Sequence, residues 1–115
     1  MERGDIVLVE LDPSVGSEQS KTRPAIVVSS NAANNSVARR GRGVITIVPL
    51  TSNVASVYVF QVLLLAEESG LQRNSKAQAE QVRSIATERI VRTIGRVSPQ
   101  RMSQLDDALR LHLSL

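Results

Sequence analysis

Short, β-branched apolar segments separated by polar stretches constrain this chain more than any other feature. They are Ile6–Leu11, Ala25–Ser29, Val44–Thr51, Val57–Ala66 and Ile90–Val97. Each has the length and composition of one strand, and none approaches the ~20 residues of a membrane span. In a chain of 115 residues, such segments predict a single domain over residues 1–115, built on a small, strongly bent sheet or an open barrel.

The end of the chain changes to helical periodicity. Ser98 is a candidate N-cap and Pro99 suits a first helical turn. The apolar positions at helical spacing are Met102, Leu105, Leu109 and Leu113. Asp106 and Arg110 are four residues apart and are expected to pair on the exposed side. The predicted fold class is therefore mainly β with one C-terminal helix.

Four stretches are harder to assign. Asn31–Val37 is consistent with one short helical turn, with Asn31 as its N-cap. Glu67–Asn74 is expected to be a loop with a turn at Gly70. Ala77–Ile85 fits a helix by propensity and a strand by alternation, and we favour a strand in its second half. Pro49 lacks a backbone donor, so the end of its strand is expected at an edge or a bulge.

The composition favours a nucleic-acid partner and argues against metal chemistry. The net charge is +3 with a pI near 10.2, and arginine, whose planar fork suits phosphate oxygens, supplies most of the positive charge. Tyr58 and Phe60 are the only aromatic residues, so RNA would be held by hydrogen bonds, arginines and shape rather than by stacking. With no cysteine and a single histidine, His112, we expect no metal site and no cofactor. The start of the chain lacks the apolar stretch of a signal peptide, and we expect a cytoplasmic protein without a membrane segment.

Several motifs occur in an order and spacing that resemble the MazF/PemK family of bacterial toxins. They are Gly4-Asp5-Ile6-Val7, Gly16-Ser17-Glu18-Gln19, Arg23-Pro24-Ala25-Ile26-Val27-Val28, Val48-Pro49-Leu50-Thr51-Ser52 and Glu80-Gln81-Val82-Arg83-Ser84-Ile85. The resemblance covers essentially the whole chain. It departs from the family at Thr22, where some relatives have a histidine before the Arg-Pro pair, so a proton transfer by that histidine cannot operate here.

The resemblance implies a fold, an activity and partners. The expected fold is a small SH3-like barrel with a terminal helix, assembled as a homodimer. The expected activity is sequence-selective, metal-independent cleavage of single-stranded RNA, with mRNA as the expected target, to 2′,3′-cyclic phosphate and 5′-hydroxyl ends. The expected partner is a MazE-like antitoxin whose C-terminal tail covers the RNA groove. Two alternatives remain open: a non-enzymatic, gyrase-binding toxin of the CcdB type, and a plain SH3-like interaction module.

Two residues are the candidate catalytic groups. Arg23 lies where a polar segment enters a core strand, and its guanidinium can hold two phosphate oxygens as negative charge develops. Because a guanidinium stays protonated near neutral pH, electrostatic stabilisation suits Arg23 better than proton transfer. Thr51 ends a strand and can donate its hydroxyl to the same phosphate; the alternative is a strand residue with a structural hydrogen bond.

Six further residues are candidate substrate contacts: Ser17, Glu18, Gln81, Arg83, Ser52 and Asn53. Glu18 would contact a base or assist the 2′-hydroxyl, or else pair with Lys21 on the surface. Gln81 would read a base edge or serve as a structural amide. Arg83 would bind phosphate or form a surface ion pair. Ser17 is a candidate contact to phosphate or ribose, whereas Ser52 and Asn53 are more typical of turn-forming residues.

Overall fold

The computed structural model describes residues 1–11 and 22–115, and in this part of the chain the sheet has seven strands. The strands are β1 Asp5–Glu10, β2 Thr22–Val27, β3 Val44–Thr51, β4 Gln61–Leu64, β5 Ser75–Gln78, β6 Arg83–Ala86 and β7 Ile90–Arg96. The helices are α1 Asn31–Arg40, α2 Ala66–Ser69 and α3 Pro99–Leu113, with short 3₁₀ turns at Ala79–Gln81 and Thr87–Arg89.

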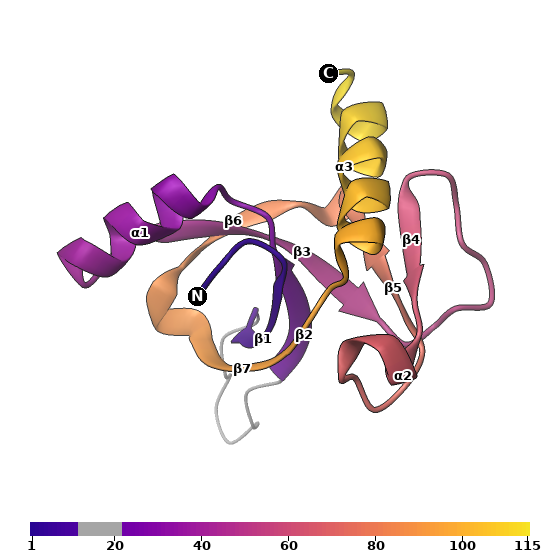
Figure 1. Cartoon of the computed structure of the whole chain (residues 1–115), viewed down its shortest axis with the longest axis horizontal. Helices are drawn as coiled ribbons and strands as arrows, with labels where there is room; N and C mark the ends of the chain where they lie inside the picture. Colours follow the sequence, from indigo (N-terminus) through magenta and orange to yellow (C-terminus); the bar gives the residue numbers. More distant parts are fainter. Residues whose placement is uncertain (12–21) are drawn as a thin grey trace, which may run out of the picture.

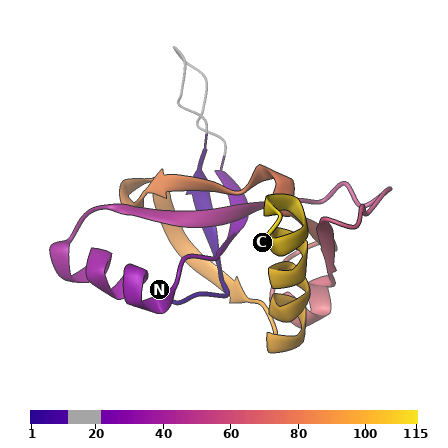
Figure 2. The same ribbon diagram turned by 90° about the horizontal axis from the view of Figure 1, so that it is seen from above.

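The sheet is antiparallel and bends around its longest strand, β3. Its order is β4-β5-β3-β2-β1-β7, and β6 pairs with the first half of β3 while β5 pairs with its end. Figure 1 shows the strands curling into an open barrel, with α1 at one end of the molecule and α2 and β4 at the other; Figure 2 shows the same separation. The predicted mainly β class with a C-terminal helix is confirmed.

Side-chain alternation along β1, β2 and β3 supplies two separate apolar clusters. Ile6, Ile26 and Val48 belong to the outer cluster, which α3 covers. Val7 and Ala25 lie on the opposite face of the same strands and belong to the inner cluster, enclosed by the bent sheet. Because successive residues of a strand point to opposite faces, these three strands are buried on both sides. Exposed functional side chains therefore lie at the ends of the strands.

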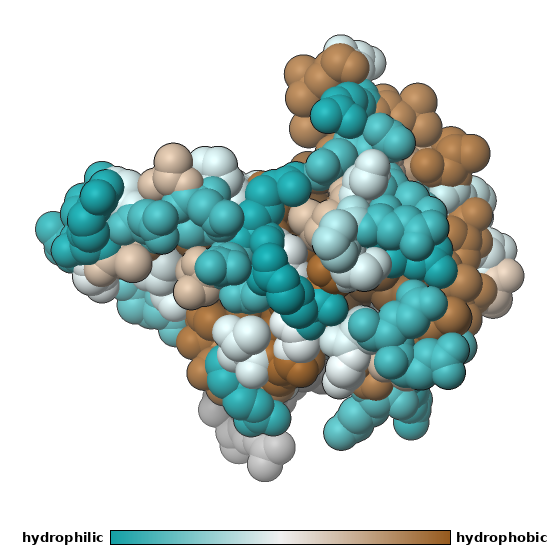
Figure 3. Space-filling model, in the orientation of Figure 1, coloured by the Kyte–Doolittle hydropathy of each residue, from teal (hydrophilic) through white to brown (hydrophobic). Residues whose placement is uncertain are grey.

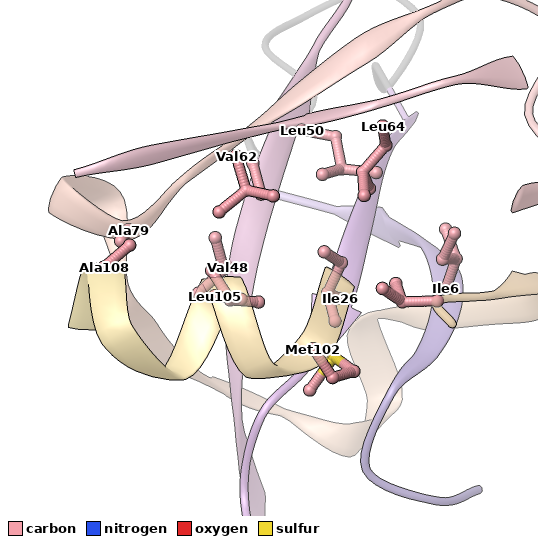
Figure 4. Packing of buried hydrophobic residues seen from close by; sticks show 12 residues of the cluster. Ile6, Ile26, Val48, Leu50, Val62, Leu64, Ala79, Met102, Leu105 and Ala108 are labelled. Carbon is pink, nitrogen blue, oxygen red and sulfur yellow. The ribbon is translucent and has the colours of Figure 1, made fainter. Parts of the chain in front are cut away.

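The C-terminal helix forms as predicted at its start and differs at its end. Ser98 is the N-cap, and its Oγ accepts a hydrogen bond from the Arg101 amide at 3.2 Å. Figure 4 shows Met102, Leu105 and Ala108 pointing from α3 toward the sheet, with Leu105 beside Val48. Leu113 is 48% exposed, so the last turn of the predicted apolar face is not part of the core.

The predicted ion pair between Asp106 and Arg110 is wrong. Asp106 pairs instead with Arg3, because the N-terminal segment lies against α3. Arg110 pairs with Asp107, three residues away, at 3.0 Å. The ion-pair partner of Asp106 is therefore determined by a tertiary contact and not by the i,i+4 spacing within the helix.

The helix after β2 is longer than the predicted single turn. Ser30, not Asn31, is the N-cap, and its Oγ accepts from the Ala33 amide at 3.2 Å. The helix continues to Arg40 and ends at Gly41, whose φ of 76° is the left-handed conformation that terminates helices. Arg39 and Arg40 thus form the last helical turn.

The predicted strand Val57–Ala66 is wrong in its first half, since only Gln61–Leu64 pair as β4. Side chains hold the preceding segment in place of a strand ladder. The Lys76 Nζ donates to the Ser56 carbonyl at 2.5 Å and lies 5.6 Å from the centre of the Tyr58 ring. Tyr58 in turn stacks on Phe60, with ring centres 5.6 Å apart.

The segments around Gln81, after Ala66 and at Pro49 differ in detail from the predicted elements. The strand favoured in the second half of Ala77–Ile85 is present as β6, but Gln81 itself lies in the 3₁₀ turn between β5 and β6. The expected loop Glu67–Asn74 begins with the short helix α2. Pro49 lies in a central strand, opposite Ala25 of β2. On the other side of β3 the pairing with β6 stops at Ile47 and that with β5 begins at Leu50, so the missing donor of Pro49 falls in this gap. None of the helices in the described part of the chain is long and apolar enough to cross a membrane.

Candidate active site

The two candidate catalytic residues lie at the ends of neighbouring strands. Arg23 is the second residue of β2 and Thr51 the last residue of β3. The strands pair with Ala25 opposite Pro49, and the same register continued by two residues places Arg23 opposite Thr51. Both side chains line one hollow of about 550 Å³, which we call the large hollow. The sheet register therefore brings together two residues that are distant in the sequence.

Arg23 also borders a second hollow, of about 260 Å³, which we call the small hollow. Gln81, at the end of the 3₁₀ turn, and Arg83, the first residue of β6, both line it and are exposed. Neither side chain forms a hydrogen bond or ion pair with residues 1–11 or 22–115. The structural alternatives considered for Gln81 and Arg83, a buried amide and a surface ion pair, thus have no support in this part of the structure.

The hydroxyl of Thr51 is oriented by the turn that follows β3. Its Oγ1 accepts a hydrogen bond from the Asn53 amide at 3.3 Å. A hydroxyl that accepts one hydrogen bond retains its own hydrogen to donate. The Oδ1 of Asn53 accepts from the Ala55 amide at 3.3 Å, so Asn53 forms the turn. Ser52 is exposed and lines the large hollow beside Thr51.

Sequence reasoning missed several polar residues at these hollows, and three of them bear on the chemistry of the site. Gln78, the last residue of β5, lines the small hollow with Gln81. Arg73 and Arg92 line the large hollow with Arg23. No sequence signal identifies Arg73 or Arg92, because each is an isolated arginine, one on a loop and the other on an outer strand. For Gln78, the alternation of the segment that contains it and Gln81 is the only signal that the two side chains could face the same side.

Other polar residues lie apart from this arrangement. The predicted contacts Ser17 and Glu18 fall outside the described residues. Glu80 accepts two hydrogen bonds from the Gln61 amide, at 3.2 and 2.8 Å, and so links the 3₁₀ turn to β4. His112 is exposed in the last turn of α3. Within the described ranges, no three His, Cys, Asp or Glu side chains gather as metal ligands would.

The chain matches, over residues 2–113, the family described as the PemK-like, MazF-like toxin of type II toxin–antitoxin systems. The chain belongs to this family. The MazF-like toxin is 62% identical to endoribonuclease MazF9 of Mycobacterium tuberculosis, over 100% of this chain and 98% of that protein. The crystal structure of MazF from Deinococcus radiodurans superposes with a TM-score of 0.76 at 27% identity, covering 100% of this chain and 97% of the other.

A further neighbour is a mycobacterial endoribonuclease solved in complex with its cognate antitoxin. It has a TM-score of 0.76 at 20% identity and covers 100% of this chain and 96% of that chain. The resemblance inferred from the motifs is confirmed, and so is the fold that it implies. This MazF-like toxin is an endoribonuclease, and the comparisons do not support a gyrase-binding toxin of the CcdB type.

Proposed function

We propose that this toxin cuts single-stranded RNA without a metal ion, by attack of a ribose 2′-oxygen on the adjacent phosphorus. The 2′-hydroxyl loses its proton, the new P–O bond closes a 2′,3′-cyclic phosphate, and the bond to the 5′-oxygen breaks. The leaving 5′-oxygen takes up a proton and becomes a hydroxyl. The observation that carries this proposal is the meeting of Arg23 and Thr51 in one hollow beside exposed polar residues.

Arg23 and Thr51 stabilise the phosphate as its negative charge grows. The guanidinium of Arg23 donates to two of its oxygens, and the Thr51 hydroxyl donates one further hydrogen bond. Arg23 remains a cation throughout, because arginine does not deprotonate near neutral pH. Glu18 is the candidate for assisting the 2′-hydroxyl or contacting a base, and Ser17 for a phosphate or ribose contact.

The small hollow is the candidate site for reading bases. The amide of Gln81 carries both a donor and an acceptor, as the edge of a base requires. Arg83, in the same hollow, is the candidate contact to a neighbouring phosphate. Ser52, at the rim of the large hollow, is a candidate ribose or phosphate contact. Asn53 shapes the turn through its Oδ1, and its side-chain NH₂ group, which has no partner among the described residues, is a further candidate donor to the substrate.

An antitoxin is the expected protein partner, since a structural relative was solved with its own. We propose that an extended C-terminal tail of a MazE-like antitoxin covers both hollows. Their described lining contains four arginines and no acidic residue, so an acidic tail would be complementary in charge.

A homodimer accounts for the apolar surface at the end of α3. Val59 and Leu111 line one shallow hollow and are 80% and 55% exposed, and Leu115 is 85% exposed. Figure 3 shows hydrophobic surface at the C-terminal end of α3. Exposed apolar residues that gather in one place typically mark an interface. We propose that a second copy of the chain covers this surface.

We further propose that residues 1–115 act as one domain and that the toxin works in the cytoplasm.

The test is incubation of purified protein with a long single-stranded RNA in excess EDTA, with mapping of the cut ends. We expect discrete cuts that end in cyclic phosphate, and none with Arg23→Ala, whose circular dichroism should match that of the wild type. Arg39→Ala is the matched control, because it removes an exposed arginine at the far end of α1 and should cut normally. Wild-type cleavage that requires a metal ion, or an active Arg23→Ala variant, would contradict the proposal.

A further inference from the structure

Two arginines at the large hollow have no part in the RNA cleavage proposed above. Arg73 lies in the loop between α2 and β5, and Arg92 lies on β7. Neither side chain forms a hydrogen bond or an ion pair with the described residues of the chain. Other arginines of the protein are engaged: Arg3 pairs with Asp106, Arg96 pairs with Asp5 at 2.6 Å, and Arg101 lies 3.5 Å from a Glu68 oxygen. The side chains of Arg73 and Arg92 thus have no structural partner among the described residues.

Their surroundings concentrate positive charge. Arg23, Arg73 and Arg92 line the same hollow, and none of its described lining residues is acidic. Like charges around one hollow repel one another, and a bound anion would relieve that repulsion. A chain of phosphates is such an anion, and an arginine fork suits phosphate oxygens.

The floor of the large hollow is apolar. It includes Leu8, Pro24 and Leu50 from three adjacent strands. In the sheet, Leu8 of β1 lies between Arg92 of β7 and Pro24 of β2. Arg92 is therefore two strand spacings from β2, roughly 10 Å between backbones. A nucleotide of an RNA strand fits this pattern, because its base and ribose have apolar faces and its phosphates carry the charge.

The loop that carries Arg73 is fixed against β7. A Cβ atom at Gly95 of β7 would lie 2.2 Å from the Ser69 carbonyl oxygen, so the end of α2 rests directly on the strand backbone. The Asn74 side chain accepts from the Ala66 amide at 2.9 Å and joins the two ends of this segment. The backbone position of Arg73 relative to β7 is consequently set before RNA binds, which lowers the entropy cost of holding a phosphate between the two arginines.

We propose that the large hollow binds the nucleotide next to the scissile phosphate, with Arg73 and Arg92 holding the phosphate on its far side and the apolar floor contacting its base and ribose. This inference rests on the proposed function, since it takes single-stranded RNA as the ligand and Arg23 and Thr51 as the cutting site.

The test measures binding separately from cleavage. The probe is a single-stranded RNA of a dozen nucleotides around a mapped cut, with 2′-deoxyribose at the cut so that it cannot react. Each phosphate near the cut is replaced in turn by an uncharged methylphosphonate. Wild-type affinity should fall roughly tenfold at one flanking phosphate, as expected for a lost charged hydrogen bond. In Arg73→Ala and Arg92→Ala that replacement should have little further effect, and the salt slope of log Kd should fall by about 0.7.

Arg39→Ala removes the same charge far from the hollow and is the matched control. Equal loss of affinity in Arg39→Ala, Arg73→Ala and Arg92→Ala would show an effect of net charge and overturn the subsite. So would a methylphosphonate effect that persists in full in both variants. Normal wild-type cleavage combined with either result would leave the proposed function intact. If the wild type fails to cut, the proposed function fails by itself, and a mixed-sequence RNA dodecamer serves as the probe for the same comparison.

Discussion

Replacing Gly95 with alanine would place a methyl group 2.2 Å from the carbonyl oxygen of Ser69. An ordinary contact between such atoms needs about 3.4 Å, so the end of α2 would have to move away from β7 by about 1 Å. Because Ser69 is buried and its Oγ donates to the Leu65 carbonyl at 2.8 Å, the whole turn would move with it. The change therefore separates Arg73 from Arg92 without altering either residue.

The size of the effect follows from this overlap. Forcing one extra methyl group into a packed contact costs about 1–3 kcal/mol. A chain of 115 residues has an unfolding entropy near 0.24 kcal/mol/K, on the basis of about 2.1 cal/mol/K per residue. The melting temperature should accordingly fall by about 4–12 °C, and the affinity for the unreactive RNA should fall with it.

The assay is thermal unfolding by circular dichroism, together with RNA binding well below the transition. Gly41→Ala is the control: it also adds a methyl group, but nothing lies within 4 Å of its Cβ, and only its positive φ of 76° resists the change. Gly41→Ala should lose about 1 kcal/mol and keep its RNA affinity. A Gly95→Ala variant with wild-type stability and wild-type RNA affinity would refute the idea that this contact positions Arg73.

Three further predictions concern other parts of the molecule. Thr51→Val should reduce kcat by about 10- to 100-fold with the melting temperature within a few degrees of wild type, since it removes one hydrogen bond to the developing charge; single-turnover cleavage would measure this. Leu105→Ala, at a side chain only 1% exposed, should lower the free energy of unfolding by about 2–5 kcal/mol in urea titrations, whereas Leu105→Asp should abolish folding. Leu111→Asp should convert the proposed homodimer to a folded monomer in sedimentation velocity, and a persistent dimer would place the interface elsewhere.

Local patterns predicted the regular elements well. The strand Val44–Thr51 has the same bounds in the structure as in the sequence, and the helix begins at Pro99 after its Ser98 cap. Both have clear period and boundary signals, which do not depend on the rest of the chain. The first half of Val57–Ala66 has the same apolar character as a strand, yet Lys76, from a distant segment, holds it as a loop. No local pattern contains that contact.

The candidate site was predictable only in part. The motifs identified Arg23 and Thr51, and the structure places both on one hollow, although their catalytic roles stay predictions. Arg73 and Arg92 could not be found from the sequence, because nothing in a lone arginine on a loop or an outer strand indicates what it faces. Their proximity to Arg23 follows from the order of strands in the sheet and from the packing of α2 on β7.

The two sides of β2 bear on how such toxins diversify. Ala25, Ile26 and Val27 are fully buried, alternately in one cluster and the other. A slip of one residue would exchange these faces and turn Arg23 away from Thr51, so mutation cannot move the proposed catalytic pair gradually. The residues that border it on surface loops, such as Ser52 and Arg73, are under no such restriction. If Arg23 and Thr51 cut RNA as proposed, a lineage built on this sheet can change the RNA sequence that it recognises by altering these loop residues, while the cutting geometry is inherited unchanged.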